Sequence, residues 1–280
     1  MYGWVLVVDG DSPGALKMWQ QVRDLQSIDR YAWQLTRDGK LELARDAFEW
    51  LYDVNVEKYG IPYVQFLWKS YKRPDLAIDV LKETLPEYTS LTDKINGWLL
   101  LGDISLSMEK WDEARDAYQH VLSMDTNEVR AWVGLGNIEY AQSHALDRAM
   151  EQFRYAISIC PECGDGYFAM AKLLEQEGSP QAAQWYEAAL QASPDNQWYA
   201  LSWAQYLRGM GRIGESIQVL QQILETYPRF AEGYYELALS YQAAGHACNQ
   251  GHEAILHAIE IKKDPRYLNL EHSLLLCSEQ

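Results

Sequence analysis

Three short motifs in this sequence have residue types and spacings that could do chemistry. Gly209-x-Gly211-x2-Gly214 matches the glycine spacing of a dinucleotide-binding loop, which needs a preceding strand and a helix that opens at the third glycine. A helical pattern comes first here, so these glycines predict a turn between two helices. The sequence contains no HExxH, GxSxG or P-loop motif. We therefore expect no catalysis and no cofactor.

Cysteines and histidines form the other two motifs. Cys160-Pro-Glu-Cys163 is half of a zinc or redox site, but it lacks nearby ligands and predicts two small residues at a turn. The loop at 246–257 is a better metal candidate, although solvated histidines are the simpler interpretation; its possible ligands are His246, Cys248, His252 and His257. With Cys277, the cysteines do not have the spacing of a small secreted disulfide framework. We expect no bound metal.

The secondary structure around these motifs can be predicted from residues 96–124, because their pattern recurs along the rest of the chain. This stretch contains Trp98-x2-Leu101-Gly102 and, after a gap, Ala114-x3-Tyr118. Residues three or four apart share one face of a helix, so each motif marks the packing side of a helix. Gly102 and Ala114 are small where two helices must approach closely, and Tyr118 fills the space one turn later. The stretch predicts a helix-turn-helix pair.

The same pattern returns along the chain with a nearly constant period. Trp132-x2-Leu135-Gly136 repeats the first motif, and the small residue of the second motif recurs in a regular series. Its members are Ala44, Ala77, Ala114, Ala149, Ala182, Ser216 and Ala254. This pattern resembles the tetratricopeptide repeat, whose period is about 34 residues. The resemblance covers most of the chain and implies an all-α fold, a right-handed α-α superhelix of about seven helix-turn-helix repeats with a C-terminal capping helix.

The repeat phase also predicts the domain organisation. We expect an N-terminal segment and leading helix at 1–26, one solenoid at 27–266 and a capping helix at 267–280. Ser12 and Pro13 predict the start of the leading helix, with the Ser12 hydroxyl as its cap. The apolar residues 5–8 are too few for a signal peptide, and they do not predict a receiver-domain strand because the helical phase begins soon after. A long loop is expected at 245–251.

The charge balance bears on the class of partner. The chain has 24 basic and 40 acidic residues, a net charge of −16. A nucleic-acid-binding face needs a basic stripe, which is absent from the sequence, and an anionic membrane surface is disfavoured for the same reason. No apolar run reaches the roughly 18 residues that a membrane span requires. We expect a protein or peptide partner and a cytoplasmic location, or a periplasmic or membrane-attached one if the N-terminus is truncated.

The resemblance places ligands on the side lined by the first helix of each repeat. The corresponding strip comprises Asp29, Trp33, Arg37, Tyr59, Phe66, Lys69, Leu99, Asp103, Arg130, Asn137, Tyr140, Asp165, Phe168, Lys172, Glu175, Trp198, Gln205, Arg208, Glu232, Tyr235 and Gln242. From it we predict these partner-binding residues: Trp33, Phe66, Lys69, Leu99, Asp103, Asn137, Tyr140, Phe168, Lys172, Gln205, Arg208 and Tyr235. The aromatic ones are expected to be exposed without a partner, and large exposed apolar patches mark interaction sites.

The lining also narrows the kind of ligand. Some members of the family clamp the C-terminal carboxylate of chaperone tails, and Asn137 and Lys172 stand at matching places. Leu99, Asp103 and Phe168 occupy places where that clamp needs polar or basic groups, which argues against a chaperone-tail binder. We predict a non-catalytic adaptor that binds a peptide in an aromatic-lined groove. Two alternatives stay open: a regulatory module that senses a small ligand or glycan, and an assembly factor or the soluble part of a membrane complex.

Overall fold

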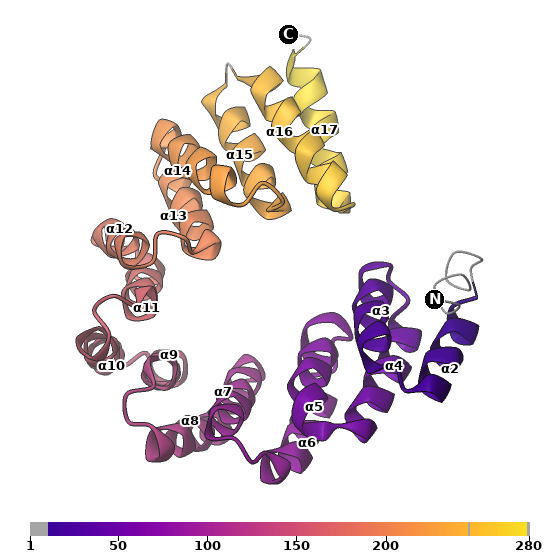
Figure 1. Cartoon of the computed structure of the whole chain (residues 1–280). Coiled ribbons are helices and arrows are strands. Elements are labelled where there is room, and N and C mark those ends of the chain that lie inside the picture. The colour runs from indigo at the N-terminus through magenta and orange to yellow at the C-terminus, as the bar shows by residue number, and fades with distance from the viewer. Residues whose placement is uncertain (1–10, 246, 279–280) are drawn as a thin grey trace. The chain divides into compact units, whose positions relative to one another are not determined.

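The protein is all-helical throughout the residues that its computed structural model describes, 11–245 and 247–278, with no strand in them. Residues 5–8 and His246, for which we made predictions from the sequence, lie outside these described residues. Two compact units divide the chain, Met1–Ala145 and Leu146–Gln280 (Figure 1). The boundary falls inside the repeat copy that runs from Trp132 to Phe153, so its two helices belong to different units.

Unit 1 consists of helices that pack in chain order, each against the one before and the one after. They are α2 (Ser12–Val22), α3 (Leu25–Arg37), α4 (Leu41–Val54), α5 (Val56–Gln65), the π-helical η1 (Phe66–Ser70), α6 (Pro74–Thr84), the 3-10 helix η2 (Leu85–Glu87), α7 (Leu91–Ser107), α8 (Trp111–Met124) and α9 (Val129–Ser143). The hairpins α3/α4, α5/α6 and α7/α8 match the repeats that the sequence spacing predicts.

Unit 2 continues the same alternation of first and second helices. It comprises α10 (Leu146–Ile159), α11 (Gly164–Gln176), α12 (Ala182–Ala192), α13 (Gln197–Gly209), α14 (Ile213–Thr226), α15 (Ala231–Ala244), α16 (Cys248–Ile261) and α17 (Pro265–Ser278). First helices also contact one another directly, α13 with α15 and α15 with α17. The long loop expected at 245–251 is shorter than predicted, because α16 already begins at Cys248.

Side chains at the helix ends fix where several helices start. Asp24 accepts a hydrogen bond from the Ser27 backbone N–H at 3.1 Å, and Asn196 accepts one from Trp198 at 3.0 Å. Each satisfies a donor that the first turn of a helix leaves unpaired. The cap of α2 is Asp11, which accepts from Gly14 at 2.9 Å, and not Ser12 as the sequence suggested. The buried Ser12 hydroxyl instead accepts a hydrogen bond from Tyr31 at 2.8 Å, which ties α2 to α3.

The small residues of the repeat series all lie in the core. Ala44, Ala77, Ala114, Ala149, Ala182, Ser216 and Ala254 are buried. Ser216 is the polar member, and its hydroxyl donates to the Ala204 carbonyl at 2.8 Å and lies 2.9 Å from the Ser240 hydroxyl. A buried hydroxyl with partners costs little, whereas an unpaired one would be destabilising. The serine therefore fits where the other copies have alanine.

Glycines permit the closest helix contacts and the tightest turns. A Cβ at Gly102 would lie 2.6 Å from the Tyr118 ring, and one at Gly134 would lie 2.3 Å from it, so the buried ring is held between α7 and α9. Gly211, with φ +76°, forms the turn between α13 and α14, which confirms that its motif is a turn. This conformation favours glycine because it has no Cβ.

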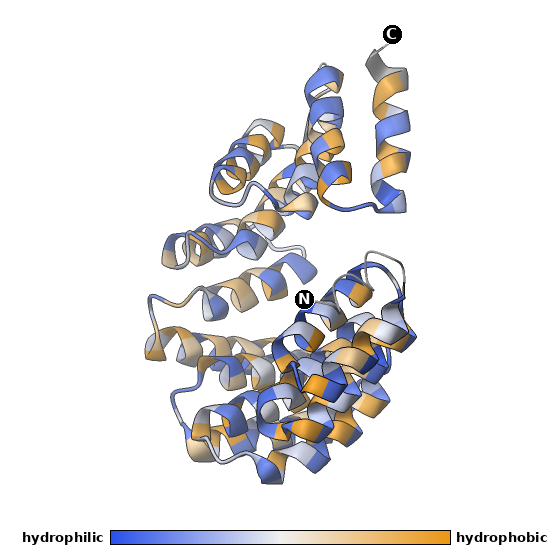
Figure 2. Cartoon of the chain, turned by 45° about the vertical axis from the view of Figure 1, so that its right-hand side comes forward, coloured by the Kyte–Doolittle hydropathy of each residue, from blue (hydrophilic) through white to orange (hydrophobic). Residues whose placement is uncertain are grey.

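The last helix covers the end of unit 2. Tyr267, Leu270 and Leu274 of α17 are buried in the same cluster as Leu237 of α15 and Ile255 of α16. Figure 2 shows hydrophobic bands alternating with hydrophilic ones along this helix, next to the C-terminal label. Such a pattern is typical of a helix with one packed face. Among the described residues, none of the helices combines the length and the apolar character that crossing a membrane would require.

Candidate functional site

The twelve predicted binding residues all lie on first helices. Unit 1 carries Trp33 on α3, Phe66 and Lys69 on η1, Leu99 and Asp103 on α7, and Asn137 and Tyr140 on α9. Unit 2 carries Phe168 and Lys172 on α11, Gln205 and Arg208 on α13, and Tyr235 on α15. The periodic spacing thus places all twelve residues on first helices, and the surroundings of each side chain decide which of them a ligand could reach.

Two of the predicted residues are not accessible. Phe66 is 0% exposed and Leu99 is 1% exposed, so the expectation that they line a binding surface is wrong. Phe66 begins the π-helical segment, in which the Tyr71 N–H donates to the Phe66 carbonyl at 2.9 Å, five residues back. A π-helical turn adds a residue and rotates the following side chains. The Phe66 ring lies 4.8 Å from that of Phe48, inside the core.

Polar strip residues of unit 1 bond to their own neighbours. Asp103 Oδ1 accepts a hydrogen bond from the Tyr118 hydroxyl at 2.8 Å, and Asp103 Oδ2 pairs with Arg130 at 3.2 Å. The carboxylate thus links α7, α8 and α9. Burial raises the pKa of Tyr118 well above its ordinary value, and the adjacent Asp103 charge adds to the effect. The hydroxyl stays protonated and remains a donor to Asp103.

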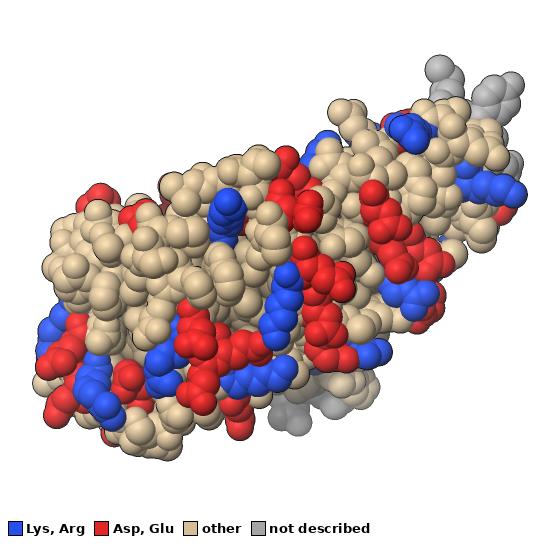
Figure 3. All heavy atoms as spheres, turned by 90° about the horizontal axis from the view of Figure 1, so that it is seen from below, with Lys and Arg blue, Asp and Glu red and all other residues tan. Residues whose placement is uncertain are grey.

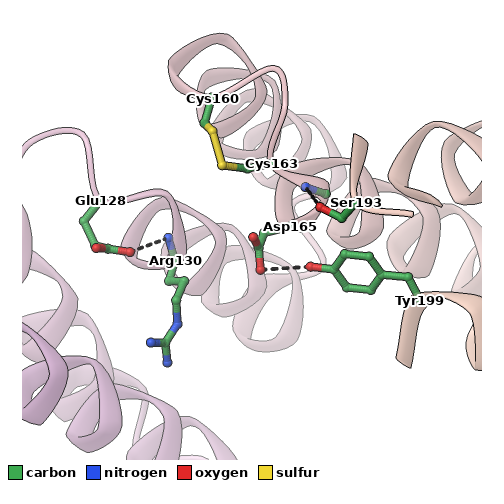
Figure 4. The surroundings of a disulfide bond; sticks show 8 residues. Glu128, Arg130, Cys160, Cys163, Asp165, Ser193 and Tyr199 are labelled. Atoms are coloured by element: carbon green, nitrogen blue, oxygen red, sulfur yellow. Dashed lines mark hydrogen bonds between the residues drawn. A yellow bond between two sulfur atoms is a disulfide. The ribbon is translucent and has the colours of Figure 1, made fainter. Parts of the chain in front are cut away.

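Equivalent links join α11, α12 and α13 in unit 2. Lys172 Nζ lies 2.7 Å from Glu175 Oε2, an oxygen that also accepts a hydrogen bond from the Tyr186 hydroxyl. Asp165 accepts from the Tyr199 hydroxyl at 3.0 Å (Figure 4). Burial raises the pKa values of both tyrosines, with a further contribution from the carboxylates. The charge of Lys172 is therefore already paired with Glu175 before any ligand binds.

Glu236 on α15 is the most buried carboxylate in these links. It is 7% exposed, and its two oxygens accept hydrogen bonds from Gln205 Nε2 at 2.9 Å and Arg208 Nη2 at 2.8 Å. A buried carboxylate is tolerated when it is paired and hydrogen-bonded. Glu232, also on α15, pairs with Arg266 of α17 at 3.1 Å. Successive first helices of unit 2 are thus joined by charged or polar side chains.

The aromatic strip residues divide into packed and exposed rings. Trp33, Phe168 and Tyr235 are half-buried, with ring centroids 4.9 Å from Phe48, 4.6 Å from Tyr199 and 5.1 Å from Tyr267 respectively. Tyr140 is half-buried as well. Trp198 is different, because it is 53% exposed. It belongs to the strip but not to the twelve predicted binding residues. It lies at the start of α13, directly before the buried Tyr199, where helical periodicity does not distinguish an exposed residue from a packing residue.

The turn between α10 and α11 contains a disulfide bond, which corrects the expectation of two unlinked small residues. Cys160 and Cys163 are bonded, with their Cα atoms 5.3 Å apart (Figure 4). The reason is geometric, since Cys160 directly follows α10 and Cys163 is the N-cap residue of α11. That brings the two residues within the usual range for a disulfide. The Gly164 N–H beside it donates to the Ser193 hydroxyl at 3.0 Å.

The histidine and cysteine segment gives no support to a metal site in the described residues. Cys248 is disulfide-bonded, and His257 lies 3.8 Å from a carboxylate oxygen of Glu260. Of the residues that the structure describes, no three His, Cys, Asp or Glu side chains are grouped so that they could hold a metal ion. His246 lies outside those residues.

The surface charge is mixed in sign. On the face drawn in Figure 3, acidic and basic side chains lie beside one another. The chain also has ion pairs between residues close in sequence, such as Arg212 with Glu215 and Arg73 with Asp75 at 2.7 Å. The Arg73 guanidinium lowers the pKa of Asp75 to about 2. Such exposed pairs contribute little to stability.

Comparisons with known proteins agree with the helical hairpins. A family model described as tetratricopeptide repeat matches residues 99–162 and 143–197. Protein bimA of Emericella nidulans is 37% identical over 65 residues, which are 23% of this chain and 8% of bimA, so the chain matches a small part of that relative.

Two solved structures share the fold at low sequence identity. Tom70 from yeast aligns with a TM-score of 0.71 and 12% identity, over 97% of this chain and 60% of that one. A tetratricopeptide repeat protein from Parabacteroides merdae aligns with a TM-score of 0.52 and 12% identity, over 92% of this chain and 100% of that one. These comparisons show that residues 99–197 match the tetratricopeptide repeat and that the chain shares its fold with these two solved structures.

Proposed function

We propose that this protein is a non-catalytic scaffold that binds an extended or helical segment of a partner protein on the first helices of unit 2, with Trp198 as the anchor. Proteins built from stacked helical repeats generally serve protein–protein interaction through such extended surfaces. The observation that carries the proposal is the 53% exposure of Trp198. A large aromatic side chain in water gains free energy when a partner covers it, and tryptophan is enriched among the residues that dominate binding energy.

A neighbouring aromatic ring restricts the orientation of the Trp198 ring. Trp198 meets Phe230 edge-on, with ring centroids 5.1 Å apart, and therefore loses little conformational freedom when a partner binds. Ser202 and Gln205 follow four and seven residues later, on the same side of α13. Gln205 is exposed, and Ser202 is half-buried. These residues would supply hydrogen bonds beside the apolar anchor.

Polar and aromatic neighbours extend this face. Phe168 and Tyr235 flank it on α11 and α15, and the ion-paired Lys172 and Arg208 supply charge at its edges. A pocket of about 340 Å³ lies where α11 and α13 end, and its lining includes Glu175, Gln205, Tyr206 and Met210. It is large enough to receive one side chain of a partner.

In unit 1 we propose a second contact surface, made by the accessible members of the strip. Trp33 and Tyr140 are half-buried, and Lys69 and Asn137 are exposed. Phe66 and Leu99 are left out because they are core residues. Asp103 contributes through its pairs with Tyr118 and Arg130, which hold α7, α8 and α9 together.

The test is partner capture from a lysate of the host cell with Trp198→Ala as the bait. We expect this variant to lose partners that the unchanged protein retains, with the same helicity by circular dichroism. Leu256→Ala is the matched control, because Leu256 is also exposed and apolar but lies on the second helix α16. Equal capture by all three proteins would overturn the proposal that the partner docks on Trp198.

A further inference from the structure

Lys94 differs from the other partly buried basic side chains of this protein. Among the described residues, five Lys or Arg residues are half-buried: Arg45, Lys94, Arg115, Lys172 and Arg208. Four of them pair with carboxylates, namely Arg45 with Glu42, Arg115 with Asp112, Lys172 with Glu175 and Arg208 with Glu236. No carboxylate within the described ranges forms an ion pair with Lys94, although the chain carries 40 acidic residues. Taking part of the water away from an unpaired charge is unfavourable, and an anion at this place would relieve that cost.

Lys94 lines a pocket that also has an apolar half. The pocket has a volume of about 360 Å³, and its lining comprises Lys82, Leu85, Pro86, Lys94 and Trp98. Lys94 and Trp98 lie four residues apart on α7, so their side chains share one face. Lys82 comes from α6, and Leu85 and Pro86 come from η2, directly after it. Lys94 therefore lines the same pocket as an indole ring, a proline and a leucine.

The walls of this pocket are held in place by packing. A Cβ at Gly97 would lie 2.8 Å from Leu85 Cδ2, so the absence of a side chain there lets η2 approach α7 closely. The Trp98 ring is stacked on His120, with centroids 4.3 Å apart and planes 21° from parallel. A ligand would meet a preformed surface, which lowers the entropy that binding costs.

The charge balance at the pocket favours an anion. Lys82 is paired with Glu113, whose carboxylate also contacts Lys110 at 3.8 Å and accepts from the Ser105 hydroxyl at 3.2 Å. Glu113 therefore already offsets Lys82, and Lys94 remains as a surplus positive charge on the lining. This local surplus contrasts with the net charge of −16 of the whole chain.

We propose that this pocket binds a small organic carboxylate with an aromatic or branched apolar body. The carboxylate would pair with Lys94, and the apolar body would lie against Trp98, Leu85 and Pro86. This site is separate from the Trp198 face of unit 2 and does not depend on it. It would give the scaffold a small-molecule ligand in addition to its protein partner.

The test uses phenylacetate as the probe on the full chain labelled with fluorotryptophan. The fluorine resonance of Trp98 is assigned by its loss in Trp98→Phe. We expect phenylacetate to shift this resonance in a saturable manner and the uncharged phenylacetamide to leave it unchanged. Acetate, which has the charge without the ring, should also leave it unchanged. An equal shift with phenylacetamide or with acetate, or no shift with phenylacetate, would overturn the proposal.

Substitutions at Lys94 give the second half of the test. Lys94→Met keeps an apolar stem but removes the charge, and it should weaken phenylacetate binding about tenfold or more. Lys94→Gln should have the same effect, and Lys94→Arg should retain binding. Lys17→Met, at an exposed lysine on α2, is the matched control and should bind as the unchanged protein does. Undiminished binding by Lys94→Met and Lys94→Gln would show that the charge is not used.

Discussion

At the scale of single residues, most of the charged side chains on the first helices already have partners in the protein itself. Asp103, Asp165 and Glu236 each accept hydrogen bonds from a neighbouring helix. Their role in the fold is to join helices, because a partly buried carboxylate with charged or hydroxyl donors is stabilised relative to an unpaired one. Binding energy for a partner must therefore come mainly from groups without such links, and Trp198 is the most exposed aromatic side chain of the strip.

The disulfide leads to a prediction at this scale. It closes a loop of only four residues, and the chain-entropy estimate for so short a loop is about 2 kcal/mol of stabilisation at 25 °C. Replacing Cys160 and Cys163 together with serine should lower the free energy of unfolding by about that amount and leave the helical circular dichroism unchanged. Urea denaturation of the two proteins without reductant measures the difference.

The double substitution is needed because Cys248 is also disulfide-bonded, so a reductant would act at more than one bond. The unchanged protein in reductant serves as the comparison and should lose at least as much stability as the double variant. If the double variant unfolds at the same urea concentration as the unchanged protein, the disulfide contributes nothing to the folded state.

At the scale of helices, close packing in each hairpin depends on small residues placed once per repeat. The buried alanine series positions the second helices, and Gly102 and Gly134 make room for the Tyr118 ring. The ring is completely buried and its hydroxyl is bonded to Asp103, so it has little freedom to move aside. Interiors packed to this density tolerate added volume poorly.

Gly102→Ala should therefore be destabilising. The new Cβ would lie 2.6 Å from the Tyr118 ring, and overpacking of this kind costs about 1–3 kcal/mol. Gly214→Ala is the control, because a Cβ there meets nothing within 4 Å and Gly214 lies in the helix α14. It should leave stability unchanged or raise it by up to about 1 kcal/mol. The urea concentrations at the unfolding midpoints of the two variants measure this difference in stability. A similar decrease of stability in both variants would contradict the packing argument.

At the scale of the whole molecule, each unit has core clusters of its own. Buried residues of α2 to α8 form one cluster in unit 1, and those of α13 to α17 form another in unit 2. Stacked repeats gain stability chiefly from their nearest neighbours, so a local defect should weaken nearby helices first. The chain should not behave as one core in which every substitution is felt equally.

Leu220→Ala tests this expectation. Leu220 is fully buried in the cluster of unit 2, and removing such a side chain costs about 2–5 kcal/mol. Amide hydrogen exchange should then become faster in α13 to α16 while it stays unchanged in α3 and α4. Leu81→Ala, at a fully buried leucine of unit 1, should show the reverse pattern. Equal acceleration in both units by either variant would indicate a single cooperative unit.

The sequence by itself determined the kind of fold, because helix period and small-residue spacing are local properties. The alanine series, Gly102 and the turn at Gly211 all predicted features that the structure has. Tertiary structure decided which side chains remain accessible, since exposure depends on neighbours that a single helical period does not describe. Phe66, where the π-helical segment begins, lies in the core, the junction of α10 and α11 joins two cysteines, and Lys94 is half-buried in a pocket that η2 also lines.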